Sequence, residues 1–281
     1  MSQNKVKIAI AGATGFVGLD LTYYLSRHPR VKISYLCAQK NVGSNIKKFD
    51  NRIKKKLPKI SSLKKVDWND VDLLFLSLPN GEAQKITKKL FKHNHLKFID
   101  LSADFRIESA KDYKKWYLIK HKANHLINKT IYSIPEFTKD KIKKYRIIAN
   151  PGCYPTSIQL ALMPLLKNSL IKKNNIIIDS KSGYSGAGKN YKSKFTHSNI
   201  DESIFAYGIH KHRHMSELDQ QFKKIVKGQF EYTFNPHLLP TFRGILSSIY
   251  LETKKNVNIK KIHSVLRKYY SKDIFIKLLK I

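Results

Sequence analysis

The chain has 281 residues, enough for two domains with buried cores. Its 54 lysine and arginine residues outnumber 20 aspartate and glutamate residues, for a formal net charge of +34, which is typical of proteins that bind nucleic acid or anionic membranes. The lysines are spread along the chain with no nucleic-acid-binding motif, and no run of 18 apolar residues occurs, so we expect neither a nucleic-acid nor a membrane partner.

The first predicted elements are a strand, a glycine turn and a helix in residues 5–29. The turn has a G-x-x-G-x-x-G pattern, which lets the backbone approach a pyrophosphate at the helix N-terminus. The alternative is that the glycines serve only close packing of the helix on the strand. The residues expected to bind a dinucleotide are Gly12, Thr14, Gly15, Phe16, Val17 and Gly18.

The second predicted strand, residues 31–39, indicates which dinucleotide is bound. In NAD-binding folds an acidic residue near the end of this strand holds the ribose 2′-hydroxyl. Here no acid is present, and Lys40 and Ser44 suit a 2′-phosphate instead. The sequence therefore predicts NADP or NADPH as the cofactor.

Further strands and helices alternate up to about residue 150. Residues 47–65 are basic and expected at the surface, 71–91 predict a strand, a turn and a helix, and 96–106 predict a strand. Pro79, in that turn, joins the expected cofactor-binding residues. This alternation predicts a doubly wound parallel sheet of the Rossmann type over residues 1–150.

A strand, a tight corner and a helix follow in residues 145–166, with Cys153 at the corner. A helix N-terminus stabilises a thiolate by about 0.3–1 kcal/mol, less than the 1.36 kcal/mol of one pKa unit, so a nucleophile here also needs a histidine. The backbone N–H groups of Cys153 and Tyr154 could stabilise an oxyanion. The alternative is that Cys153 is buried and serves only packing, a role that fits Cys37 on its apolar strand better.

The pattern changes in the second half of the chain. Residues 174–188 predict a strand that leads into a Ser/Gly loop, 230–253 predict two extended runs, 257–270 a helix and 273–281 a strand. This order predicts an α+β catalytic or substrate domain over residues 151–281 with a mostly antiparallel sheet.

The run "YGIHKHRHMSE", residues 207–217, is expected to be extended and to present three histidines, His210, His212 and His214, on one side. A metal site is not favoured, because no cysteine or acidic cluster lies near in the sequence. We favour the hypothesis that one histidine acts as acid and base and that Glu217 orients it, over a metal site. Arg213 and Arg243 could bind an anion, and His237 is a less favoured candidate.

Two cysteines far apart in the sequence do not make a disulfide framework, which fits a reducing compartment. The first 15 residues lack the long apolar core and the cleavage site of a signal peptide. We therefore expect a cytoplasmic location.

The stretches "GATGFVG", "LSLPNGEA", "DLSADFR", "YSIPE", "ANPGCYPTSIQLAL", "SGYSGAGK", "HKHRHMSE" and "HLLPTFRGIL" together resemble the N-acetyl-γ-glutamyl-phosphate reductase family of arginine biosynthesis. The related aspartate-semialdehyde dehydrogenases share the glycine turn and a cysteine corner. Their cysteine follows Asn rather than Pro-Gly, so they are the second choice.

The resemblance implies NADPH-dependent reduction of an acyl phosphate through a cysteine thioester. It implies that Cys153 is the nucleophile, His212 the acid/base and Glu217 its support, although the sequence leaves His210 and His214 open. It also implies a homo-oligomer, either a dimer or a tetramer. The residues expected to contact substrate are Arg106, Asn150, Arg213 and Arg243, and those near the nicotinamide are Ser182 and Gly183.

The family resemblance also implies a further C-terminal segment with a helix that returns to the cofactor domain, which this sequence does not contain. Two alternatives stay open at this point. A related reductase could act on an aspartyl or other acyl phosphate, because one methylene changes selectivity by only about 1–3 kcal/mol. A catalytically decayed, basic protein could instead bind nucleic acid.

Overall fold

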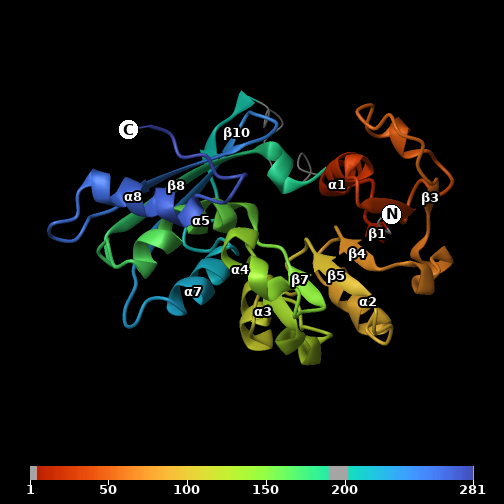
Figure 1. Ribbon diagram of the computed structural model, residues 1–281, viewed down its shortest axis with the longest axis horizontal. Helices are drawn as coiled ribbons and strands as arrows, with labels where there is room; N and C mark the ends of the chain where they lie inside the picture. The colour runs from red at the N-terminus through yellow and green to blue at the C-terminus, as the bar shows by residue number, and fades with distance from the viewer. Residues whose placement is uncertain (1–4, 190–201, 281) are drawn as a thin grey trace. The chain divides into compact units, whose positions relative to one another are not determined.

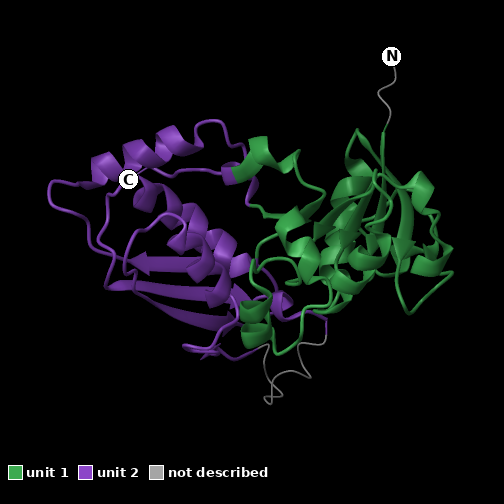
Figure 2. Ribbon diagram, turned by 90° about the horizontal axis from the view of Figure 1, so that it is seen from below, with its two compact units in different colours: residues 1–133, 138–151 green, residues 134–137, 152–281 purple. Residues whose placement is uncertain are grey.

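The computed structural model describes residues 5–189 and 202–280 (Figure 1). The chain forms two compact units, coloured separately in Figure 2. Unit 1 comprises residues 1–133 and 138–151, and unit 2 comprises residues 134–137 and 152–281. Among the described helices, none combines the length and the apolar character needed to cross a membrane.

Unit 1 contains a seven-stranded parallel sheet in the order β3-β2-β1-β4-β5-β7-β6, which confirms the predicted doubly wound fold. The strand order reverses between β1 and β4, where open α/β sheets bind ligands at the carboxyl ends of the strands. The strands are β1 (Val6–Ala11), β2 (Val31–Cys37), β3 (Ile60–Ser61), β4 (Leu73–Leu76), β5 (Lys97–Asp100), β6 (Thr130–Tyr132) and β7 (Ile147–Ala149).

Helices α1 (Phe16–Arg27) and α2 (Glu82–Leu90) cover opposite faces of this sheet. Alternate residues of β1 explain the two faces, because Ile8 packs in the same core as Leu19 of α1, whereas Ala9 packs with Ala83 of α2. Two further helices, α3 (Ala110–Tyr117) and α4 (Pro135–Ile142), were not predicted.

The basic segment 47–65 is only partly a surface segment. Its lysines are mostly exposed, but Ile53 and Ile60 are buried with Ile46 in the core under α1. The 3-10 turn η1 begins at the first of these buried residues, and η2 follows the last of them. The 3-10 turns of unit 1 are η1 (Ile46–Lys48), η2 (Leu63–Lys65), η3 (Trp68–Asp70) and η4 (Asn124–Lys129).

The "DLSADFR" stretch forms a buried network after β5. The Asp104 carboxylate accepts hydrogen bonds from the backbone N–H groups of Gly81 (2.7 Å) and Gln84 (3.0 Å), and so caps the start of α2. Asp100 accepts from the Ser102 N–H at 2.9 Å. Burial and the neighbouring Asp104 raise the pKa of Asp100 to about 6. The motif therefore fixes the turn that precedes α2.

Unit 2 contains a four-stranded mixed sheet in the order β11-β8-β10-β9. The long strands β8 and β10 run parallel, whereas β11 and β9 are antiparallel to their neighbours. The strands are β8 (Ile176–Gly183), β9 (Phe205–Ala206), β10 (Tyr232–Leu239) and β11 (Ile245–Tyr250), and the 3-10 turn η5 (Tyr184–Ala187) follows β8.

One face of this sheet is covered by three helices, α5 (Cys153–Lys167), α7 (Met215–Lys223) and α8 (Ile259–Tyr270). The core joins Ile158 of α5 and Phe222 of α7 to Ile178 and Phe234 of the sheet. Burial of such apolar side chains, at about 25 cal/mol per Å², is the main force that holds the layers together.

The predicted strand at residues 273–281 is wrong over residues 273–280, and residue 281 lies outside the described residues. The segment is irregular there, and Ile274 and Phe275 are 89% and 86% exposed. Its apolar pattern suggested a strand, but a strand also needs a neighbouring strand for its backbone hydrogen bonds. Within the described residues the segment has none.

Candidate active site

The cysteine corner joins β7 to α5. The strand ends at Ala149, and the helix begins at Cys153 with Gly152 as its N-cap residue; in the described part of the chain no side chain caps this helix end. Cys153 is exposed, and it forms no disulfide among the described residues. An accessible thiol at the N-terminus of a 15-residue helix is placed where a developing negative charge is stabilised.

The other cysteine has the opposite environment. Cys37 is buried in β2, and burial raises the pKa of its thiol to about 11. It is therefore protonated at neutral pH and shielded from reagents.

A histidine and a glutamate lie directly against the corner. His214 Nδ1 lies 2.7 Å from Glu217 Oε1, and the imidazole also hydrogen-bonds the Cys153 side chain. The second carboxylate oxygen of Glu217 accepts the Gly152 N–H at 2.9 Å. Because Nδ1 donates to Glu217, Nε2 is the nitrogen left for the thiol. Glu217 thus ties His214 and the corner together.

Gly152 is a glycine because there is no room for a side chain. A Cβ at this position would lie 2.8 Å from Glu217 Oε1 and still closer to the His214 ring. The backbone of Gly152, at φ −66° and ψ 159°, is in the extended region that any residue adopts and imposes no restriction of its own. The close fit of His214 and Glu217 therefore explains this residue.

The electrostatics of the pair favour a protonated His214. Burial alone would lower the pKa of His214, but the Glu217 carboxylate and Cys153 outweigh it and raise this pKa above its ordinary value. Glu217 is fully buried, so its charge is little screened by solvent. The arrangement can accept a proton from a thiol and hold it.

The predicted extended run of histidines is wrong. Gly208 (φ +62°) and His210 (φ +57°) adopt left-handed conformations, and α7 begins at Met215, so the three rings do not share one side. His210 is exposed. The signal that could have found the pair is the i, i+3 spacing of His214 and Glu217, which places both on one helix face.

His212, the histidine expected to act as acid and base, has different surroundings. Its ring lies edge-on against Tyr154, Tyr207 and Phe234. Burial, His214 and Arg213 lower its pKa to about 3, so the ring is neutral. These contacts favour His214 over His212 for the proton-transfer role, while the family-based assignment to His212 stays a prediction.

The expected substrate ligands fall into two groups. In unit 1, Arg106 is nearly buried, and its guanidinium donates to the carbonyls of Asn150 (2.8 Å) and Leu101 (3.0 Å). In unit 2, Arg213 and Arg243 are exposed, and the Arg243 guanidinium lies 4.8 Å from the Phe242 ring centroid. Arg106 thus holds the backbone before the corner, and its contact with substrate stays a prediction.

The glycine turn of unit 1 allows close packing of the backbone. A Cβ at Gly18 would collide with the backbone of Gly12 and Ala13, so this glycine is required for close packing of α1, as the alternative hypothesis held, whereas a Cβ at Gly12 would collide with the Ser77 backbone after β4. Gly15 has more room, since only the Gly12 carbonyl lies near, at 3.4 Å. Among the described residues no side chain caps α1, and its first turn has no acid. The backbone N–H groups at the start of α1 therefore suit a phosphate.

The remaining expected cofactor residues lie after strands. Lys40 and Ser44 follow β2, Pro79 follows β4, and both Lys40 and Pro79 are exposed. In unit 2, Ser182 and Gly183 end β8, and a Cβ at Gly183 would collide with the backbone of residues 241–243. Their contacts with a cofactor stay predictions.

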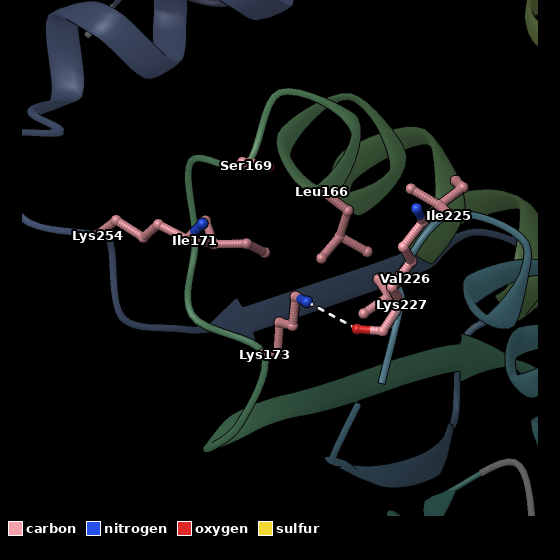
Figure 3. Close-up of a pocket in the computed structure, with 8 residues that line it drawn as sticks. All are labelled: Leu166, Ser169, Ile171, Lys173, Ile225, Val226, Lys227 and Lys254. Carbon is pink, nitrogen blue, oxygen red and sulfur yellow. Dashed lines mark hydrogen bonds between the residues drawn. The ribbon is translucent and has the colours of Figure 1, made fainter. Parts of the chain in front are cut away.

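A separate hollow of about 250 Å³ lies in unit 2 (Figure 3). Apolar residues such as Leu166 and Ile171 line it together with three lysines, and Lys173 Nζ donates to the Lys227 carbonyl at 2.9 Å. None of the expected site residues lines this hollow. Within the described ranges, we also find no group of three His, Cys, Asp or Glu side chains that could hold a metal ion.

Comparison with known proteins gives a consistent result. The family description "Semialdehyde dehydrogenase, NAD binding domain" matches residues 7–145, and "Semialdehyde dehydrogenase, dimerisation domain" matches residues 153–281. A probable chloroplastic N-acetyl-gamma-glutamyl-phosphate reductase of Arabidopsis thaliana is 40% identical, over 99% of this chain and 69% of that protein. The N-acetyl-gamma-glutamyl-phosphate reductase of Afipia carboxidovorans is 42% identical, over 98% of this chain and 79% of that protein.

Solved structures show the same fold at lower identity. Aspartate semialdehyde dehydrogenase II of Vibrio cholerae aligns with a TM-score of 0.69 at 17% identity, over 99% of this chain and 82% of that chain. The aspartate semialdehyde dehydrogenase of Candida albicans, solved with NADP, aligns with a TM-score of 0.61 at 16% identity, over 95% of this chain and 77% of that chain.

Proposed function

The chain belongs to the N-acetyl-γ-glutamyl-phosphate reductases of the semialdehyde dehydrogenase family, and on that premise we propose that it reduces N-acetyl-γ-glutamyl phosphate to N-acetylglutamate semialdehyde and phosphate with NADPH, a step of arginine biosynthesis. The observation that carries this proposal is the contact of an exposed Cys153 thiol with the half-buried His214, which is paired with the buried Glu217, at a helix N-terminus. This arrangement provides a nucleophile and its base.

The first half of the reaction uses the cysteine and the histidine. The Cys153 thiol gives its proton to His214 Nε2, and Glu217 stabilises the imidazolium through Nδ1. The thiolate attacks the acyl carbonyl, so that a carbon–sulfur bond forms and the carbon–oxygen bond to phosphate breaks. The departing phosphate takes the proton from His214, and a thioester remains on Cys153.

The second half releases the aldehyde. NADPH, when bound, supplies the hydride that reduces the thioester carbonyl. The N-terminal N–H groups of α5 stabilise the oxyanion of the hemithioacetal formed on Cys153. Cleavage of the carbon–sulfur bond then gives the semialdehyde and the Cys153 thiolate, which pairs again with a protonated His214 once a solvent proton arrives.

The residues of unit 1 fit a phosphorylated dinucleotide. The uncapped start of α1 at Gly15 suits the pyrophosphate, and Lys40 and Ser44 after β2 suit a 2′-phosphate where an NAD site would carry an acid. Ser182 and Gly183 of unit 2 would hold the nicotinamide. Two cysteines without a disulfide among the described residues fit a reducing compartment, for which we propose the cytoplasm.

The test is the reverse reaction, phosphate-dependent reduction of NADP by the purified chain. We expect N-acetylglutamate semialdehyde to be preferred over aspartate semialdehyde by about 100-fold in kcat/KM, because the two substrates differ by a methylene and by an acetylamide in place of an ammonium group. A preference for aspartate semialdehyde would favour the related dehydrogenases. Absence of turnover together with salt-sensitive binding of DNA or RNA would favour the non-enzymatic alternative.

We further propose that the chain forms a homodimer through the outward face of the unit 2 sheet. The matched description of residues 153–281 is a dimerisation domain. Within the described residues of unit 2, the helices cover one face of the sheet, and the other face exposes Ile177 (45%), Leu246 (62%) and Tyr250 (59%). Ile177 and Tyr250 are partners across β8 and β11, and Leu246 lies further along β11 on the same face, opposite Lys181, so the three exposed apolar side chains share one face of the sheet.

A charge in this patch is expected to weaken the dimer. Leu246→Glu should raise the dissociation constant by at least about 100-fold, because burial of a carboxylate in an apolar interface is unfavourable. Sedimentation velocity over a concentration series measures the change. Leu279→Glu is the matched control, since Leu279 is 73% exposed outside the sheet and its substitution should leave the dimer intact. An unchanged dimer in Leu246→Glu contradicts the proposed interface.

A further inference from the structure

His212 lies in an aromatic cage directly beside the proposed base. Ring centroids of Tyr154, Tyr207 and Phe234 lie 5.6, 5.4 and 5.5 Å from that of His212. These rings come from α5, the segment after β9, and β10, so three elements fix the imidazole from different sides. Gly208, at φ +62°, lies in the turn before this residue, and a Cβ added at Gly208 would lie 3.4 Å from His212 Cδ2. Such a cage fixes the position of the ring.

The caged ring makes a directed contact with the proposed base. The backbone N–H of His214 donates to His212 Nδ1 at 3.2 Å, and the two imidazole centroids are 4.9 Å apart with a tilt of 39°. A nitrogen that accepts a hydrogen bond carries no proton, so His212 makes this contact only as a neutral ring with its proton on Nε2.

The charges around His212 keep it neutral. Burial, His214 and Arg213 lower the pKa of His212, whereas the Glu217 carboxylate on α7 acts in the opposite direction and has the weaker effect. Tyr154 on α5 and Tyr207 after β9 face the ring with pKa values raised by burial, so both are neutral too. A neutral His212 leaves the imidazolium of His214 without a second positive charge 4.9 Å away.

We propose that His212 is a positioning residue, which acts as a neutral hydrogen-bond acceptor to hold the backbone and ring of His214 against Cys153. The proposal rests on the proposed function for its kinetic consequence, but not for the geometry. It gives His212 a role in the reaction that differs from proton transfer, and it explains why two histidines of the run lie together.

The test compares two substitutions of His212. In His212→Asn, the amide oxygen can take the place of Nδ1 and accept the His214 N–H. In His212→Phe, the ring is kept but the acceptor is lost. His214→Gln is the reference for loss of the base. Each protein is assayed for kcat and KM in the reverse reaction, and for the rate at which iodoacetamide alkylates Cys153 over a pH series that spans about 6.5 to 8.5, the ordinary pKa values of histidine and cysteine.

We expect His212→Phe to lower kcat by about tenfold with KM within about twofold, as for loss of one hydrogen bond that orients a base. Its alkylation profile should move toward that of His214→Gln, while His212→Asn stays within about threefold of the wild type. If His212→Phe does not fold, His212→Gln replaces it, because its polar atoms take the place of Nε2 rather than Nδ1.

Two results would overturn the proposal. If His212→Asn is as impaired as His214→Gln, His212 itself transfers the proton. If His212→Phe equals the wild type in both assays, His212 only fills space. Alkylation needs neither substrate nor NADPH, so its pattern decides the role of His212 even if the protein turned over no N-acetylglutamyl substrate.

Discussion

Cys153→Ala is expected to lower kcat of the reductase by about 10⁴-fold or more, because removal of a covalent nucleophile leaves only substrate binding and the oxyanion-stabilising groups. The fold should be retained, since Cys153 is exposed and its side chain contributes little to the core. The measurement is phosphate-dependent NADP reduction with N-acetylglutamate semialdehyde, alongside a thermal unfolding curve.

The chain offers a matched control in its other cysteine. Cys37→Ala should leave kcat within about twofold, at a cost of about 1 kcal/mol in the free energy of unfolding for the lost core volume. Iodoacetamide at neutral pH should modify Cys153 and spare Cys37, whose buried thiol has a pKa of about 11. Turnover that persists in Cys153→Ala would show that another group is the nucleophile.

The features that could be predicted from the sequence are those fixed by local patterns. The strand, glycine turn and helix around Gly12 are local, because positive φ and close backbone packing restrict that position to glycine. The cysteine corner is local for a similar reason, since Pro151 and Gly152 end a strand and a helix follows at once. Both predictions needed no knowledge of distant residues.

The assignment of the histidine depended on contacts that no local pattern contains. An extended segment would have presented the three histidine side chains on one side. Instead, the left-handed residues Gly208 and His210 turn the chain, and only His214 contacts Glu217. Glu217 reaches Gly152, 65 positions earlier in the chain, through a single hydrogen bond. This long-range contact places the His214–Glu217 pair against the corner, which the i, i+3 spacing of the pair does not predict by itself.

The "DLSADFR" stretch shows a second limit of the sequence. A resemblance to a family indicates that Arg106 matters, and the predicted reason was a contact with substrate. In the structure its guanidinium donates to backbone carbonyls of Leu101 and Asn150, and Asp104 caps a helix. A motif can therefore mark residues that hold a corner in place as well as residues that contact a ligand.

Gly152→Ala is expected to lower kcat by about 10²–10⁴-fold, the range associated with loss of a positioned general base. The added methyl group needs the space that the His214 ring and Glu217 Oε1 occupy, so the pair must move away from Cys153. The backbone at φ −66° accepts alanine without strain, and the Gly152 N–H is retained. The alkylation rate of Cys153 at neutral pH should fall together with kcat, because the thiol loses its base.

A second glycine in the same unit makes this prediction specific. Gly228 has φ +81° and open space around it, so Gly228→Ala should reduce the free energy of unfolding by about 1 kcal/mol and leave kcat unchanged. Gly152→Ala should lose much of its kcat at an assay temperature where both variants are folded. A change in its free energy of unfolding therefore cannot explain that loss. If Gly152→Ala kept both its kcat and its alkylation rate, the His214–Glu217 pair would not be the base that activates Cys153. The one methyl group added at Gly152 thus tests whether the contact between the start of α7 and the start of α5 activates Cys153.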